Sequence, residues 1–215
     1  QRQTMARVLS AVGLDCERDD RHLFRDLSFD VASGEILHLT GPNGSGKTTL
    51  LRRLVGISSV VDGGVTWFPD SPERTAEPCE KIWYIAHRPA VTLLQSPLEN
   101  MAYALALHGI QVPESVVWDA LETVGLRGFE DVPSHQLSAG QQRRVALARL
   151  YLPLEPDRVR AWVLDEPLTA LDIEAVDRLK ARIIDYARAG GSVIMTSHHG
   201  LDSETVRTLE LGAAL

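Results

Sequence analysis

The sequence predicts an α/β fold, in which a mostly β segment leads into a core of buried strands and helices that a run of helices interrupts. Three observations predict it. The glycine-rich segment 41–48 lies between an apolar run and a helical pattern, helical patterns follow one another between residues 97 and 150, and a strand–helix–strand pattern returns after Pro156. Buried strands that alternate with helices are typical of a parallel sheet, so we expect one in the core.

The N-terminal third is predicted to be mostly β. Residues 5–14 and 27–31 read as strands on either side of a polar stretch, and residues 65–68 and 82–86 read as two more. We expect an antiparallel β region here. The short apolar run 35–40 differs from these strands, because it leads directly into the glycine-rich segment and suits a buried parallel strand.

Helices dominate the middle of the chain. The helix that follows the glycine-rich segment is expected over 47–55, and three more over 97–108, 114–124 and 139–150, with Ser96 and Ser138 as caps of two of them.

After Pro156 we expect a strand at 160–164, a helix over 173–189 and a strand at 192–196. We therefore predict one domain over 1–215, with a core of about 1–88 and 156–215 and a helical lobe of about 89–155.

Composition excludes several classes of protein. The 215 residues carry a formal net charge of −7 without a basic stripe, so we expect no nucleic-acid partner. Cys16 and Cys79 are the two cysteines and lack metal-ligand spacing, so neither a disulfide framework nor a zinc site is expected. No apolar run approaches the length of about 18 residues that a membrane helix needs.

The segment 41–48 matches the phosphate-binding pattern G-x-x-x-x-G-K-[ST] at every fixed position. Glycines let the backbone turn tightly and point successive N–H groups inward, and the helix that follows adds the positive end of its dipole. Lys47 is expected to reach the β- and γ-phosphates, and the Thr48 hydroxyl to coordinate Mg²⁺. The residues predicted to bind the nucleotide here are Gly41, Pro42, Asn43, Gly44, Ser45, Gly46, Lys47, Thr48 and Thr49.

Two carboxylates end a predicted buried strand. Asp165 would supply the carboxylate ligand of Mg²⁺ that pairs with Thr48, and Glu166 would polarise an attacking water. The chain is thus predicted to bind a nucleoside triphosphate with Mg²⁺ and to hydrolyse it.

Further motifs carry a family resemblance. The segments GPNGSGKT (41–48), LSAGQ (137–141), VLDEP (163–167), LTALD (168–172) and TSH (196–198) follow one another in this order. With these motifs the chain resembles the nucleotide-binding domain of ATP-binding cassette (ABC) proteins along nearly its whole length. The resemblance implies a phosphate-loop NTPase with a RecA-like core, an N-terminal antiparallel β region, a helical lobe, and ATP and Mg²⁺ as its ligands.

The resemblance also implies a head-to-tail pair of cassettes with two ATP molecules in the interface. Ser138, Gly140 and Gln141 would then bind the γ-phosphate that a second copy presents, since the helix start behind them is an anion site. Asp172 would lie in the loop that contacts the second copy. His198 is assigned as a catalytic switch residue near the γ-phosphate, and His199 as a bystander.

Two positions depart from the family pattern. No aromatic residue stands near position 18 to stack on adenine, so either Arg18 stacks its guanidinium on the base or this segment is a solvated charge cluster. The family's glutamine after the strand 82–86 is replaced by Arg88, which cannot ligate a cation, and Gln95 is a possible partial substitute.

Within the family, residues 16–29, 87–100 and 125–150 resemble one branch, the ATP-binding subunits of haem exporters in bacterial cytochrome c maturation. That branch implies integral membrane subunits as partners and a peripheral location on the cytoplasmic face of the inner membrane. A regulatory ATP-binding module with little hydrolysis and an ATPase of another transporter remain the alternatives.

Overall fold

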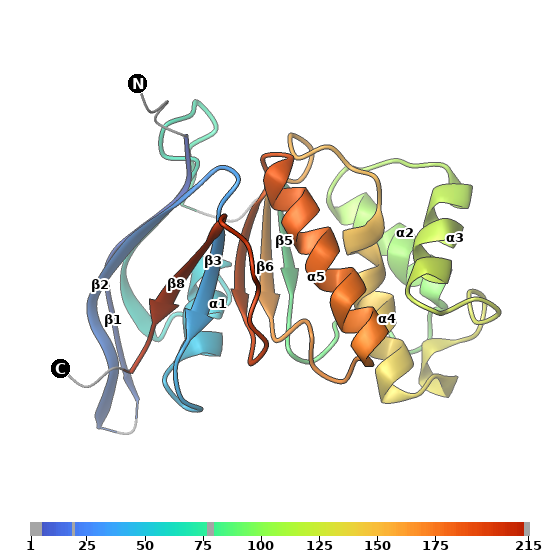
Figure 1. Ribbon diagram of the computed structural model, residues 1–215, viewed down its shortest axis with the longest axis horizontal. Coiled ribbons are helices and arrows are strands. Elements are labelled where there is room, and N and C mark those ends of the chain that lie inside the picture. The colour runs from blue at the N-terminus through green and yellow to red at the C-terminus, as the bar shows by residue number, and fades with distance from the viewer. Residues whose placement is uncertain (1–5, 19, 77–79, 213–215) are drawn as a thin grey trace.

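Two sheets organise residues 6–18, 20–76 and 80–212, the part of the chain that the computed structural model describes. One is a three-stranded sheet of order β2-β1-β4, and the other a five-stranded sheet of order β5-β6-β7-β3-β8. Figure 1 shows the three-stranded sheet at one end, helices α2, α3 and α4 at the other, and the five-stranded sheet between them. The predicted antiparallel β region and α/β core are both present.

The antiparallel sheet consists of β1 (Arg7–Arg18), β2 (Arg21–Ala32) and β4 (Val61–Trp67). Its hairpin corrects the expectation of a polar segment between residues 15 and 26, because both strands run through that segment. Cys16 and Phe24 are paired across the hairpin and buried, while the charged residues alternate with such positions and stay in solvent. The alternation of buried and exposed residues was hard to recognise in the sequence, because β2 is an edge strand rich in polar residues. Met5 and Cys79 lie outside the described residues.

All neighbouring strands of the second sheet are parallel. Four of its strands were predicted, and the edge strand β8 was missed because its residues are half or fully exposed and form no apolar run. The strands are β3 (Ile36–Thr40), β5 (Ile82–Ile85), β6 (Ala161–Asp165), β7 (Ser192–Thr196) and β8 (Val206–Glu210).

The predicted helices are present. The side chains of Ser96 and Ser138 each accept a hydrogen bond from the backbone N–H of the residue three positions later. The side chain of that later residue accepts a hydrogen bond from the serine N–H, so each pair forms a capping box. The last predicted helix of the lobe ends at Ala148 and continues as a 3₁₀ turn. The helices are α1 (Lys47–Leu54), α2 (Pro97–Leu107), α3 (Glu114–Thr123), α4 (Ala139–Ala148) and α5 (Ile173–Arg188), with 3₁₀ turns η1 (Ser134–Gln136) and η2 (Arg149–Tyr151). Among the described residues, no helix combines the length and the apolar character that crossing a bilayer requires.

The parallel sheet separates two hydrophobic cores. Along β6, Val163 joins the core shared with α1 and the antiparallel sheet, while Trp162 and Leu164 join the core shared with α5 and the helical segment. Successive side chains of a strand point to opposite faces, so an uninterrupted apolar strand serves both cores. The cores leave the carboxyl ends of the strands free to carry polar groups.

We predict that Tyr186→Phe lowers the free energy of unfolding by about 1–2 kcal/mol. The Tyr186 ring stacks on Trp162 with 3.7 Å between ring centroids, and its hydroxyl donates to the Val159 carbonyl at 2.5 Å in a buried position. Phenylalanine keeps the stack but leaves that carbonyl without its donor. Urea unfolding measures the change, and Tyr103→Phe, at a side chain that is 55% exposed, is the matched control. An equal effect of both substitutions would contradict the role of the buried hydroxyl.

Candidate functional site

The segment 41–48 wraps around the ammonium group of Lys47 at the start of α1. Lys47 Nζ donates to the carbonyl oxygens of Gly41 at 2.7 Å and Pro42 at 3.0 Å. Gly41 has φ 134°, and a Cβ there would lie 2.2 Å from the Leu211 carbonyl oxygen, so this turn requires glycine. Gly46 precedes the helix with φ 96°. The loop therefore has the tight, glycine-dependent path that the sequence predicted.

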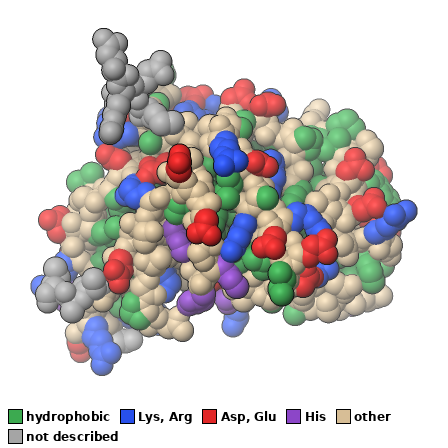
Figure 2. All heavy atoms as spheres, viewed as in Figure 1, with side chains coloured by type: hydrophobic (Ala, Val, Ile, Leu, Met, Phe, Trp, Pro, Cys, Tyr) green, Lys and Arg blue, Asp and Glu red, His purple; other side chains and the backbone are tan. Residues whose placement is uncertain are grey.

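A hollow of about 450 Å³ opens beside this loop, and we call it the central hollow. It brings together the loop, the end of β6 and the segments after β5 and β7, since the carboxyl ends of parallel strands meet at one edge of a sheet. Figure 2 shows histidine side chains gathered at the lower edge of the drawn face, with acidic and basic side chains interspersed above them. The lining residues are Arg18, Leu23, Asn43, Gly44, Gly46, Lys47, Thr48, Thr49, His87, Asp165, Glu166 and His198.

The Asp165 carboxylate is almost fully buried and only half satisfied. Its Oδ1 accepts hydrogen bonds from the hydroxyls of Thr48 at 3.2 Å and Thr196 at 2.9 Å. Its Oδ2 is buried and has no hydrogen-bond partner within the described residues. A free carboxylate oxygen beside a threonine hydroxyl fits Mg²⁺, which usually takes one or two protein oxygens and completes its shell with phosphate and water. Asp165 and Thr48 are therefore suited to hold the ion together.

Glu166 occupies a strained backbone conformation. Its φ is 51°, in the left-handed region that a residue with a side chain rarely adopts, and its N–H donates to Thr196 Oγ1 at 2.8 Å. The side chain is 13% exposed, and its Oε1 lies 3.6 Å from Nε2 of His198, whose side chain is 66% exposed. The turn thus directs the Glu166 carboxylate into the central hollow beside His198.

Arg143 is a part of the site framework to which the sequence analysis assigned no role. From α4 its Nη1 donates to the carbonyls of Ala86 at 2.7 Å and His87 at 2.9 Å, and its Nη2 donates to those of Asp165 at 3.2 Å and Glu166 at 2.6 Å. Burial lowers the pKa of Arg143, and the charges of Asp165 and Glu166 oppose that shift. No sequence pattern marked this role, which is visible only from the burial of Arg143 in α4, because arginine is rarely buried without partners.

The predicted signature residues lie away from the central hollow. Ser138 caps α4 by accepting from the Gln141 N–H at 3.2 Å, and the Gln141 side chain accepts from the Ser138 N–H at 2.8 Å. Neither residue lines the hollow, and neither does Gly140. Asp172 caps α5 through the Ala175 N–H and forms an ion pair with Arg144 of α4 at 3.2 Å. The predicted second anion site, at the start of α4, thus stands apart from the central hollow.

Arg18 lines the hollow together with Leu23, which the sequence analysis did not select. Leu23 packs next to Gly46, where an added Cβ would lie 3.2 Å from its Cβ. The hollow therefore has an aliphatic side chain and a guanidinium in this region, in place of the aromatic ring that the family pattern has. Both are suited to contact a flat base, Leu23 by packing and Arg18 by stacking.

The two residues considered in place of the family's glutamine, Arg88 and Gln95, both lie outside the central hollow. His87, in contrast, lines it. The Gln95 carbonyl accepts from the Ser134 hydroxyl at 2.7 Å, and its side-chain oxygen is buried without a hydrogen-bond partner in the described part of the chain. His199 is also outside the hollow, and its N–H donates to Ser197 Oγ.

Comparisons with known proteins identify the family. The profile of the ABC transporter family matches residues 24–169. The cytochrome c biogenesis ATP-binding export protein CcmA of Pseudomonas fluorescens is 46% identical over 209 residues, which are 95% of this chain and 96% of that protein. The protein of the same name from Yersinia pseudotuberculosis is 44% identical over 90% of this chain and 87% of its own length.

Solved structures agree on the fold. A putative ABC transporter ATP-binding protein from Pyrococcus furiosus matches with a TM-score of 0.74 and 24% identity, covering 94% of this chain and 96% of that one. The ATP-binding cassette MJ0796, in a dimeric post-hydrolysis state bound to ADP and Pi, matches with a TM-score of 0.74 and 20% identity over 95% of this chain and 96% of its own. The chain therefore belongs to the ABC transporter family and has the fold of its ATP-binding cassettes.

Proposed function

We propose that this chain is the ATP-hydrolysing subunit of a transporter that exports haem for cytochrome c biogenesis. The observation that carries the ATPase activity is the central hollow, in which Lys47, Thr48, Asp165, Glu166 and His198 line one cavity. These groups provide a phosphate cradle, ligands for Mg²⁺ and a carboxylate base, which are the parts that phosphoryl transfer to water needs.

The proposed catalytic roles follow from the contacts. Lys47 would move from the carbonyls of its loop to the β- and γ-phosphates, and Thr48 with Asp165 would hold Mg²⁺, since the Thr48 hydroxyl and the unpartnered Oδ2 of Asp165 are suitable oxygens. Glu166 accepts the proton of the attacking water. His198, 3.6 Å from Glu166 and largely exposed, donates a hydrogen bond to the γ-phosphate when ATP fills the hollow. Mg²⁺ supplies charge neutralisation at the phosphates.

The separation of the two anion sites supports a second copy of the chain as partner. Ser138 is exposed at the start of α4 and does not line this chain's own hollow, so Ser138 and the helix start behind it are proposed to bind the γ-phosphate held by a second copy. A homodimer then closes over two ATP molecules, and hydrolysis removes the charge that joins the halves.

The export role rests on relatives and on the branch resemblance. The relatives from Pseudomonas and Yersinia are named as cytochrome c biogenesis export proteins, and this chain spans nearly their full length. The haem cargo rests on the likeness of residues 16–29, 87–100 and 125–150 to that branch. We place the chain on the cytoplasmic face of the inner membrane, bound to integral membrane subunits.

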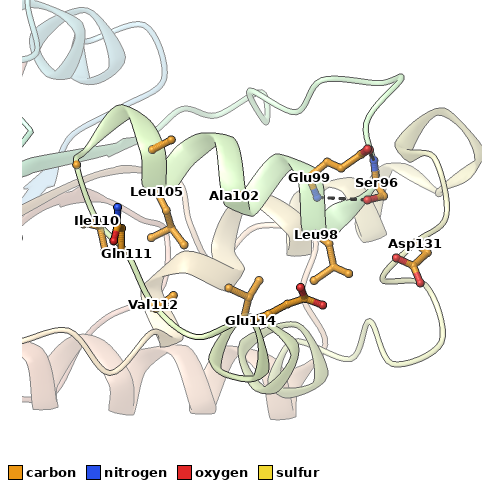
Figure 3. Close-up of a pocket in the computed structure, with 13 residues that line it drawn as sticks. Ser96, Leu98, Glu99, Ala102, Leu105, Ile110, Gln111, Val112, Glu114 and Asp131 are labelled. Carbon is orange, nitrogen blue, oxygen red and sulfur yellow. Dashed lines mark hydrogen bonds between the residues drawn. The ribbon is translucent and has the colours of Figure 1, made fainter.

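A groove on the helical lobe is the proposed docking surface for those subunits. It has a volume of about 990 Å³ and runs between α2 and α3 (Figure 3). Apolar side chains such as Leu98, Leu105 and Val117 form its floor, and Glu99, Glu114 and Asp131 contribute carboxylates. We propose that a short basic amphipathic helix from a cytoplasmic loop of a membrane subunit occupies it, because such loops are rich in Lys and Arg and the groove offers the opposite charge.

Glu166→Gln should lower ATP turnover by about 10²-fold or more, because the amide keeps the shape of the carboxylate but cannot accept a proton. Binding of MgATP should survive, as a fluorescent ATP analogue would report. Phosphate release by the purified chain measures turnover. Normal turnover in this variant would contradict the assignment of the base, and a low rate in the unaltered chain would favour a regulatory module.

Dimerisation can be tested with two variants that both keep the helix cap. In the Glu166→Gln background, sizing with MgATP should show a dimer that Ser138→Asp abolishes, because the added carboxylate faces the γ-phosphate of the second copy. Ser138→Asn is the control, since asparagine also caps helices but adds no charge. Equal dimerisation of the aspartate and asparagine variants would contradict the proposed interface.

The groove can be tested by charge reversal at its exposed acids. Glu114→Lys combined with Asp131→Lys should reduce recovery with co-expressed membrane subunits by about tenfold, because like charges then face the basic helix. Phosphate release by the isolated chain should not change. Asp202→Lys with Glu204→Lys, before β8 at the opposite edge of the parallel sheet, is the control. Unchanged recovery of the groove variant would contradict the docking surface.

A further inference from the structure

The loop after β5 presents one side chain to the central hollow, and it is a histidine. His87 lines the hollow together with Lys47, Thr48, Asp165 and Glu166, whereas the next residue, Arg88, does not. The His87 ring has no hydrogen bond or ion pair within the described residues, and its side chain is exposed. An unengaged imidazole therefore stands among the groups that surround the γ-phosphate in the proposed reaction.

The position of His87 is fixed through its backbone. The Arg143 guanidinium binds the His87 carbonyl with one nitrogen and the Glu166 carbonyl with the other, at 2.9 Å and 2.6 Å. The backbones of His87 and of the proposed base are thus held by one rigid, planar group. Catalytic groups must keep their separation to within a fraction of an ångström. A shared hydrogen-bonding partner for the two segments therefore favours a functional role for the loop after β5.

Chemistry favours His87 over its neighbours for contact with water. An imidazole nitrogen either donates or accepts a hydrogen bond, as a glutamine amide does, whereas the Arg88 guanidinium only donates. The Arg88 guanidinium would also be repelled by the ammonium group of Lys47 if it entered the hollow close to it. Arg88 is exposed and makes no side-chain hydrogen bond or ion pair with the described residues, which agrees with a side chain turned away from the hollow.

We propose that His87 is a catalytic residue that hydrogen-bonds to the water attacking the γ-phosphate and orients it with Glu166. It thereby replaces the glutamine that Arg88 has displaced from this segment. The inference rests on the proposed ATPase function and adds a second group that contacts the reacting water. Because this water is oriented most tightly in the transition state, the contribution of His87 should fall on kcat rather than on ATP binding.

Steady-state phosphate release by the full chain tests this with three variants and ATP as the probe. His87→Leu, which keeps the bulk but no hydrogen bond, should lower kcat by about 10- to 100-fold with KM within about threefold. His87→Gln should restore most of kcat, because the amide again donates and accepts. Arg88→Gln should leave kcat unchanged. Thermal melting and binding of a fluorescent ATP analogue confirm that each variant is folded.

The outcomes separate this inference from the function on which it rests. Unchanged kcat in His87→Leu, failure of His87→Gln to restore it, or an equal loss in Arg88→Gln would each overturn the role of His87. If Glu166→Gln abolishes turnover in the same assay while His87→Leu does not, the ATPase function stands and the inference alone falls. If neither variant differs from an inactive parent chain, the proposed function itself falls.

Discussion

The buried guanidinium of Arg143 joins the three parts of this cassette on which the site depends. It belongs to α4, and it donates hydrogen bonds to carbonyls at the ends of β5 and β6. A charged group pays a large desolvation penalty in such a place, which its lowered pKa reflects, and four carbonyl contacts offset it. Without this group those carbonyls would lose this donor, and the backbone segments at His87 and Glu166 would lose the link between them.

Backbone strain at Glu166 and burial of Asp165, at the end of β6, also fix the positions of site residues. Glu166 holds a φ of 51° because Thr196 binds both its N–H and the carboxylate of Asp165, so the next strand fixes the turn. Asp165 keeps one oxygen unpartnered inside the protein, which is costly unless a cation completes it. The site is therefore organised before its ligands bind, and little of the binding energy is needed to order these side chains.

The sequence predicted the phosphate loop, the carboxylate pair and the helical lobe because each has a local pattern with a physical cause. Lys47, Thr48, Asp165, Glu166 and His198 do line one cavity, because each lies at or after the carboxyl end of a strand of the parallel sheet. The outer part of the β1–β2 hairpin, within residues 15–26, and strand β8 were missed because their residues are largely polar or exposed and form no apolar run. Leu23, His87 and Arg143 were missed for another reason. Their proposed roles depend on which residues of distant segments become neighbours in the fold, and no spacing in the sequence encodes that.

The arrangement also offers a path by which events at the γ-phosphate would reach the proposed second copy of the chain. Arg143 lies on α4, and the start of α4 is the exposed signature that Ser138 caps. The next residue, Arg144, pairs with Asp172 at the start of α5, so two adjacent residues of α4 contact the site and the segment after Glu166. A change of charge in one hollow therefore acts on a helix whose own N-terminus is proposed to hold the nucleotide of the other subunit. Because α4 is short and held on two sides, we expect it to move as one unit, as the proposed two-state closure would need.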